Sequence, residues 1–206
     1  MIPSKTLRAA AFIISPAGVS AGEELRWTGT EDVMKLTAPK DPLILHVDSP
    51  LKLRSLTFDP GALNAIQIKG QTITLADGGS IAFAKLPGDV GMKKTSSATI
   101  ASDLKVSGRI SLANQNRHYL GGEKLVVAGK MKGNGNISIA GVKQGIVQLA
   151  GDNSEFTGAF VIETGSLMLS HSAALGSGTK PVTLNGGAVV MIENGILRWG
   201  ADEQIA

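Results

Sequence analysis

Apolar and polar residues alternate along much of the chain in short runs that end at glycine or polar turn residues. In Phe160–Leu169, apolar side chains recur at every second position on either side of Thr164-Gly165. The same arrangement returns 22 residues later in Val182–Met191, with Gly186-Gly187 at the corresponding place. An alternation of period two puts apolar side chains on one face of a β-strand, and glycine accepts the positive φ that a sharp bend requires. The pattern therefore predicts pairs of short strands joined by tight corners.

Similar strand–turn units lie upstream of this pair. Ile73–Phe83 has the same pattern with one more residue at its corner. Looser copies are Lys124–Ala128, Asn136–Ala140 and Gly145–Leu149. Sandwiches and up-and-down barrels reverse direction through short hairpin turns, whereas Ser170–Pro181, which links the two best copies, is too long for such a turn and fits the third side of a coil. We therefore predict a parallel β-solenoid of stacked tiers, each tier being one full turn of the chain. A sandwich or barrel is the competing all-β fold.

The 22-residue period also predicts which side chains stack on successive tiers. The predicted neighbours are Ile162 and Leu184, Leu167 and Val189, Glu163 and Asn185, and Asp152 and Ala174. The first two pairs are apolar and belong in a core. The last two contain no pair of carboxylates, and a polysaccharide-cleaving β-helix needs such a pair beside a basic residue.

The first 21 residues have the order of a secretory signal peptide. Lys5 and Arg8 precede the uncharged stretch Ala9–Val19, and small residues follow up to Ala21. A short amphipathic cap is the alternative, because Ser15-Pro16 interrupts the apolar stretch. Cleavage after Ala21 would remove two of the 20 Lys and Arg residues, which leaves the rest nearly balanced by 17 Asp and Glu. Basic residues are not clustered among aromatics, so no nucleic-acid partner is predicted.

Composition supports a chain built of strands. Of the 206 residues, 43% are hydrophobic, enough to bury a core, and 26 are glycine, which disfavours a helical bundle. The absence of cysteine excludes disulfides, thiolate zinc sites and cysteine nucleophiles. No apolar run approaches the roughly 18 residues of a transmembrane helix. Stability must therefore come from packing and from the backbone ladders between tiers.

The order of motifs in Gly145–Gly187 carries a family resemblance. Asn153–Gly158 reads NSEFTG, Ala173–Gly178 reads AALGSG and Val182–Gly187 reads VTLNGG. In this order and spacing they resemble the autotransporter-associated β-strand repeat. That repeat runs from an N-x-Y/F-T-G turn through an A-x-A-L-G-S-G link to V-T-L-N-G-G. One such motif alone would be uninformative, but their succession is specific.

The resemblance is strong over residues 104–206 and weaker over 25–103. It implies a right-handed single-stranded parallel β-helix of the kind found in passenger regions. The predicted organisation is a signal peptide at 1–21, then a β-rich part with the first tiers at 22–103, and then the β-helix at 104–206. The chain stops in what looks like the opening of another copy, Ile196–Ala206. We expect a truncated chain whose open last tier self-associates, because an uncovered strand edge is a pairing surface.

The resemblance implies a non-enzymatic function. The chain would be an exported structural or adhesin-like passenger region of a bacterial surface protein, secreted or associated with the outer membrane. Its partner would be a host or cell-surface glycan or protein. A carbohydrate-binding or polysaccharide-cleaving β-helix protein is the alternative function.

We predict no catalytic, cofactor-binding or metal-binding residue, and the sequence leaves ligand-binding residues unknown. His46, His118 and His171 have no ligand-like spacing to one another or to carboxylates. No G-x-S-x-G elbow surrounds a serine, and Gly176–Lys180 lacks the frame of a phosphate-binding loop.

The remaining candidates are the two tryptophans and the methionines. Trp27 and Trp199 each end a Leu-Arg-Trp string, and an exposed indole could stack on a sugar ring. We expect both to pack at strand ends instead. The methionines are expected to fill the core rather than bind a soft metal; they are Met34, Met168 and Met191.

Overall fold

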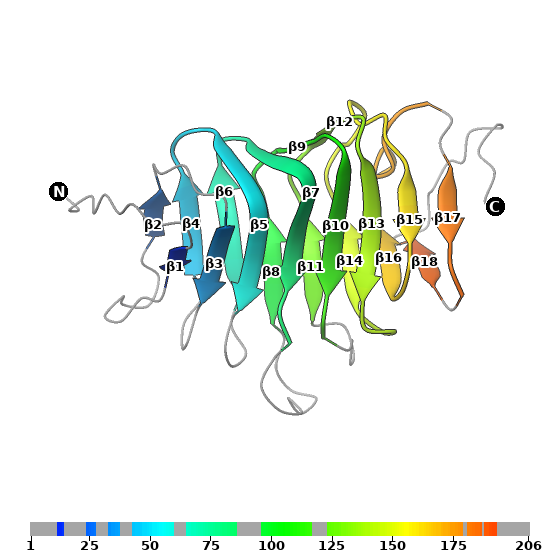
Figure 1. Cartoon of the computed structure of the whole chain (residues 1–206), viewed down its shortest axis with the longest axis horizontal. Coiled ribbons are helices and arrows are strands. Elements are labelled where there is room, and N and C mark those ends of the chain that lie inside the picture. Colours follow the sequence, from blue (N-terminus) through cyan, green and yellow to red (C-terminus); the bar gives the residue numbers. More distant parts are fainter. Residues whose placement is uncertain are drawn as a thin grey trace.

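The protein is a parallel β-solenoid in the computed structural model (Figure 1). The structure describes residues 12–14, 24–27, 33–37, 43–59, 65–85, 96–116, 123–178, 181–186 and 188–192. All regular elements among them are β-strands, and the pairings between neighbouring strands are parallel. This confirms the predicted fold class, because the hairpins of a sandwich or an up-and-down barrel would give antiparallel neighbours.

Two long sheets form two sides of the solenoid. The first sheet contains β1 (Phe12–Ile14), β3 (Val33–Thr37), β5 (Leu51–Asp59), β7 (Ile73–Phe83), β10 (Arg109–Asn114), β13 (Asn136–Gly141), β15 (Phe160–Ile162) and β17 (Val182–Leu184), in this order. The second contains β2 (Glu24–Trp27), β4 (Leu43–Val47), β6 (Ile66–Gly70), β8 (Ser97–Ile100), β11 (Lys124–Val127), β14 (Ile146–Leu149), β16 (Ser166–Leu169) and β18 (Val189–Ile192). Sequence order and spatial order agree, so each tier rests on the one before it.

A third, shorter side joins the two sheets. It consists of the first halves of β5 and β7 together with β9 (Leu104–Val106) and β12 (Met131–Gly133). A bridge between Gly133 and Phe156 extends it by another tier. The N–H of Ser177 then donates to the carbonyl oxygen of Phe156 at 3.1 Å, which places the link after β16 on this side, as predicted.

Alternation of side chains produces the core between the three sides. Strand β4, for example, buries its first, third and fifth residues and leaves the two between them half-buried. Parallel pairing then stacks equivalent apolar residues along the axis. One inward column of the first sheet comprises Met34, Leu56, Ile81, Leu112, Ile139, Ile162 and Leu184. Continuous stacking of this kind replaces the disulfides that the sequence lacks.

The stacking predicted from the 22-residue period is correct on one sheet and wrong by one residue on the other. Ile162 pairs with Leu184, as predicted. Leu167, however, pairs with Val190 rather than Val189, whose side chain is 47% exposed. The corner before β18 contains one residue more than the corner before β16, and a shift of one residue turns a strand's apolar set to the other face.

Glycine is required at the corner that ends β6. Gly70 has a φ of +115°, and a Cβ there would collide with the carbonyl oxygen of Val47 on the preceding tier. Gly78, in the predicted corner of β7, has a φ of +73° but open space around it. The first position therefore needs glycine for both conformation and close approach, and the second for conformation alone.

The ends of the chain bear on the predicted organisation. Phe12–Ile14, inside the predicted signal peptide, forms β1 and pairs with β3. The rest of residues 1–21 and the last residues, 193–206, lie outside the described residues. The boundaries at residues 21 and 103 and the self-association of the last tier therefore stay predictions.

Candidate functional site

One buried asparagine ties neighbouring tiers together on the third side. Asn153 is fully buried, and its Oδ1 accepts a hydrogen bond from the N–H of Met131, on the preceding tier, at 2.7 Å. Its Nδ2 donates to the carbonyl oxygen of Ala174, on the following tier, at 2.6 Å. The amide thus satisfies a donor and an acceptor that the irregular backbone would leave unpaired. This Asn opens the NSEFTG motif and has a structural role.

A second buried polar corner lies where the first sheet turns into the second. Asn114 Nδ2 donates to the carbonyl oxygens of Glu123 and Ile146, both at 2.9 Å, while its Oδ1 accepts from the N–H of Asn116 at 3.0 Å. Glu123 is only 5% exposed, and its Oε2 has no hydrogen-bond partner. The hydroxyl of Ser96, on the neighbouring tier, is equally unpartnered. At this corner the polar atoms of the Asn114 side chain form hydrogen bonds that join separate segments of backbone.

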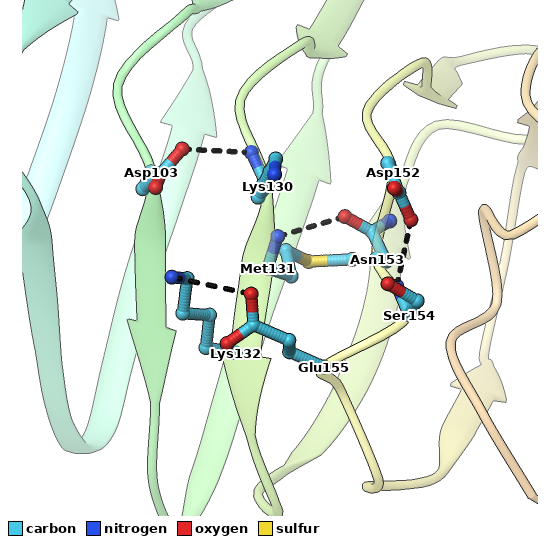
Figure 2. A network of polar contacts seen from close by, with 8 residues as sticks. All are labelled: Asp103, Lys130, Met131, Lys132, Asp152, Asn153, Ser154 and Glu155. Atoms are coloured by element: carbon cyan, nitrogen blue, oxygen red, sulfur yellow. Dashed lines mark hydrogen bonds and ion pairs between the residues drawn. The ribbon is translucent and has the colours of Figure 1, made fainter.

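Six charged side chains lie on the outer surface of the third side, and Figure 2 shows five of them, all but Lys105, on consecutive tiers. We call this group the polar edge. It consists of Asp103, Lys105, Lys130, Lys132, Asp152 and Glu155. Its residues come from β9, β12 and the NSEFTG turn with their flanking residues, and register places them in two adjacent columns.

Each carboxylate of the polar edge already has a partner. Asp103 Oδ1 accepts from the backbone N–H of Lys130 at 3.1 Å, and Asp152 Oδ1 accepts from the N–H of Ser154 at 3.1 Å. Glu155 Oε1 forms an ion pair with Lys132 Nζ at 3.3 Å. Figure 2 shows these contacts as dashed lines. The arrangement fixes the turns on consecutive tiers.

The pKa of Asp152 determines whether this carboxyl group can act as a general acid. The backbone N–H of Ser154 lowers the pKa of Asp152 below its usual value most strongly, followed by the Ser154 side chain. Burial opposes this, and His171 and Lys130 lower the pKa by smaller amounts. A general acid for glycoside cleavage needs a raised pKa so that it carries a proton at neutral pH. Asp152 therefore stays ionised and acts as a turn-fixing anion.

Lysines on the third side form a second feature, which we call the lysine row: Lys52, Lys105 and Lys132. Register stacks Lys52 on Thr74, Thr74 on Lys105, and Lys105 on Lys132. Lys52 and Lys105 are exposed. The row lies on a continuous strip of strand backbone, because β5, β7, β9 and β12 run parallel there.

The candidate residues taken from the sequence do not converge. His46 is half-buried on β4, and His171 Nδ1 accepts from the N–H of Ala173 at 3.1 Å in its own turn. Trp27 is 8% exposed, as expected for packing at a strand end. Met34 is fully buried, whereas Met168 and Met191 are half-buried on the outer face of the second sheet. His118 and Trp199 lie outside the described residues.

The two polar contacts predicted between successive tiers are found in the structure, one of them displaced by one residue. Asn185 Nδ2 donates to Glu163 Oε2, as the 22-residue period predicts. Asp152 lies one residue before Asn153, which contacts Ala174, so its predicted place is also correct to within a residue. Among the described residues, no group of three or more His, Asp or Glu side chains is placed to hold a metal ion. The described part of the chain also contains no helix long and apolar enough to cross a membrane.

Sequence reasoning missed the polar edge and the lysine row. The tiers that carry Asp103 and Lys130 are 27 residues apart, whereas those that carry Met131 and Asn153 are 22 apart. A search at a fixed period of 22 could not bring Asp103, Lys105, Lys130 and Lys132 together. The signal was present in the parallel spacing of Asp-Leu-Lys at 103–105 and Lys-Met-Lys at 130–132.

Comparison with known proteins gives one distant relative. No protein-family profile matches the chain, and no solved structure matches it significantly. The chain is similar to an uncharacterized lipoprotein, YdeK, of Escherichia coli (strain K12), with 26% identity over 227 aligned residues. The alignment covers 92% of this chain but only 16% of YdeK. The chain is therefore similar, along nearly its whole length, to a small part of a much longer protein.

Proposed function

We propose that this chain is a non-enzymatic, structural or adhesin-like part of an exported bacterial surface protein, of the passenger type with autotransporter-associated β-strand repeats. The observation that carries the proposal is the uninterrupted parallel stack from β3 to β17, in which polar side chains are used to join tiers. Such a stack makes a stiff rod whose outer strips repeat along the axis. Rods of this kind present surfaces at a distance from the cell.

The relative supports the proposed location. YdeK is named a lipoprotein, and lipoproteins are held at membranes by their lipid. A location at the cell surface or in the secreted fraction follows for this chain as part of the proposal, together with removal of residues 1–21. Protease treatment of intact cells that express a tagged chain tests it. The expected result is cleavage without lysis and a mature N-terminus at Gly22, and a chain found only inside lysed cells would contradict the proposal.

Binding and turnover need separate assays. The purified protein is applied to an array of neutral and acidic glycans, and release of reducing ends is measured on the same polymers. We expect binding to a surface glycan or protein without release of reducing ends. Reproducible turnover that scales with protein concentration would overturn the non-enzymatic proposal.

The alternative, a carbohydrate-binding or polysaccharide-cleaving β-helix, has one observation in its favour. The polar edge places Asp103, Lys130 and Asp152 on adjacent tiers, and β-helical carbohydrate enzymes need carboxylates beside a basic residue. The lowered pKa of Asp152 weighs against acid catalysis there. If turnover is found, Asp103→Asn and Asp152→Asn should abolish it while a Glu163→Gln control on another corner does not.

A further inference from the structure

The ammonium groups at the start of the lysine row lack carboxylate partners. Among the described residues, no carboxylate lies within ion-pair distance of Lys52 or Lys105, and Lys132 alone in the row has one, Glu155. Asp103 lies two residues before Lys105 on the same strip, but its Oδ1 is held by the N–H of Lys130. Lys52 and Lys105 therefore present exposed ammonium groups without an ion-pair partner in the described part of the chain, on the third side beside the carboxylates of the polar edge.

The spacing of this charge follows the solenoid axis. Neighbouring parallel strands lie about 4.8 Å apart. The backbone positions of Lys105 and Lys132 are therefore separated by one strand spacing, and Lys52 lies two spacings before Lys105. Lys52 and Lys105 are therefore about one Debye length apart at physiological ionic strength, roughly 8–10 Å, and repel each other only weakly. An extended polyanion lying along the axis would place one anionic group beside each of these two ammonium groups.

The described aromatic side chains exclude stacking as the mode of binding. Trp27, Phe58, Phe83, Phe156 and Phe160 are all buried. Single-stranded nucleic acids are held largely by bases stacked on exposed aromatics, and neutral sugars commonly use an aromatic platform as well. Acidic sugar chains can bind through charge and hydrogen bonds alone, and the Thr74 hydroxyl lies between Lys52 and Lys105 to supply one such bond.

We propose that the lysine row, led by Lys52 and Lys105, binds a carboxylate-bearing acidic polysaccharide that lies along the solenoid axis. This inference rests on the proposed function as a surface-binding rod and names the class of its partner. The flat strip of parallel strands and the repeat along the axis favour a linear polymer over a compact anion.

The test measures binding of polygalacturonate to the full chain by calorimetry at low and at physiological salt, with dextran as the neutral polymer. The variants are Lys52→Glu/Lys105→Glu and the charge-neutral Lys52→Gln/Lys105→Gln. The matched control is Lys85→Glu/Lys143→Glu, which makes the same charge change at exposed lysines near the corner between the two long sheets. Circular dichroism confirms that each variant is folded.

We expect the wild type to bind polygalacturonate but not dextran, and the charge reversal in the row to weaken binding by about tenfold or more. The charge-neutral variant should lose less affinity, and the control should bind like the wild type. Equal weakening by the control, no binding of polygalacturonate at low salt, or equally tight binding of double-stranded DNA would each overturn the proposal. Release of reducing ends from polygalacturonate would instead contradict the non-enzymatic function while leaving binding by the row intact.

Discussion

Replacing Asn153 by alanine should destabilise the solenoid at a defined place. The substitution removes both atoms that bridge the tiers, so the N–H of Met131 and the carbonyl oxygen of Ala174 lose their partners. Met131 and Ala174 are fully buried, so water cannot replace the amide without opening the core.

The magnitude follows from the number of groups left unpaired. A buried donor or acceptor without a partner costs about 1–3 kcal/mol, so the two together predict a loss of about 2–6 kcal/mol in the free energy of unfolding. In a chain of this size, 1 kcal/mol corresponds to about 2–4 °C in melting temperature. We therefore expect a melting transition lowered by roughly 4–24 °C.

The assay combines urea unfolding with amide hydrogen exchange, because tiers of an array can open separately. The exchange of Met131 should accelerate more than that of Ile81, which lies two tiers earlier in the stack. Asn134→Ala is the control, since Asn134 is an exposed asparagine close to β12 with no side-chain hydrogen bond in the described structure. An Asn153→Ala variant as stable as the control would refute the bridging role.

Three further predictions test the geometry. Gly70→Ala should lower the free energy of unfolding by more than about 1 kcal/mol, because a Cβ there would collide with the Val47 carbonyl oxygen. Gly78→Ala should cost only the conformational strain of a positive φ, about 1 kcal/mol. The midpoints of urea unfolding of the two variants measure the difference. Val190→Asp should destabilise the protein by about 1–3 kcal/mol, because Val190 packs on the core, whereas Val189→Asp should have little effect, because Val189 is exposed. If Val189→Asp instead lowered the melting temperature more, the register predicted from the 22-residue period would be the correct one. Because the pKa of Asp152 is lowered in the folded state, its contribution is present above the unfolded pKa and lost as pH falls through the folded pKa. Asp152→Asn should therefore lessen the acid-induced loss of stability, and an unchanged acid limb in pH-dependent melting would contradict that role.

The sequence by itself determines the architecture, because a solenoid is specified locally. Alternation of period two defines each strand, glycine marks corners such as Thr164-Gly165, and the repeat brings Ile162 onto Leu184. Each tier contacts only its neighbours, so local pattern and repeat length suffice without long-range information. The stacking of Glu163 and Asn185 follows from the same rule.

Only the tertiary structure determines which residues stack on one another where a corner differs in length from the corner of the preceding tier. One additional residue before β18 puts Val190, and not Val189, against Leu167. A separation of 27 residues rather than 22 brings Lys130 beside Asp103 and so creates the polar edge. In the sequence, Asn134 and Asn153 look alike, but only Asn153 lies where the backbone leaves an N–H and a carbonyl unpaired on either side. Burial and hydrogen-bond partners are set by the stacked neighbours, and a single stretch of sequence does not contain them.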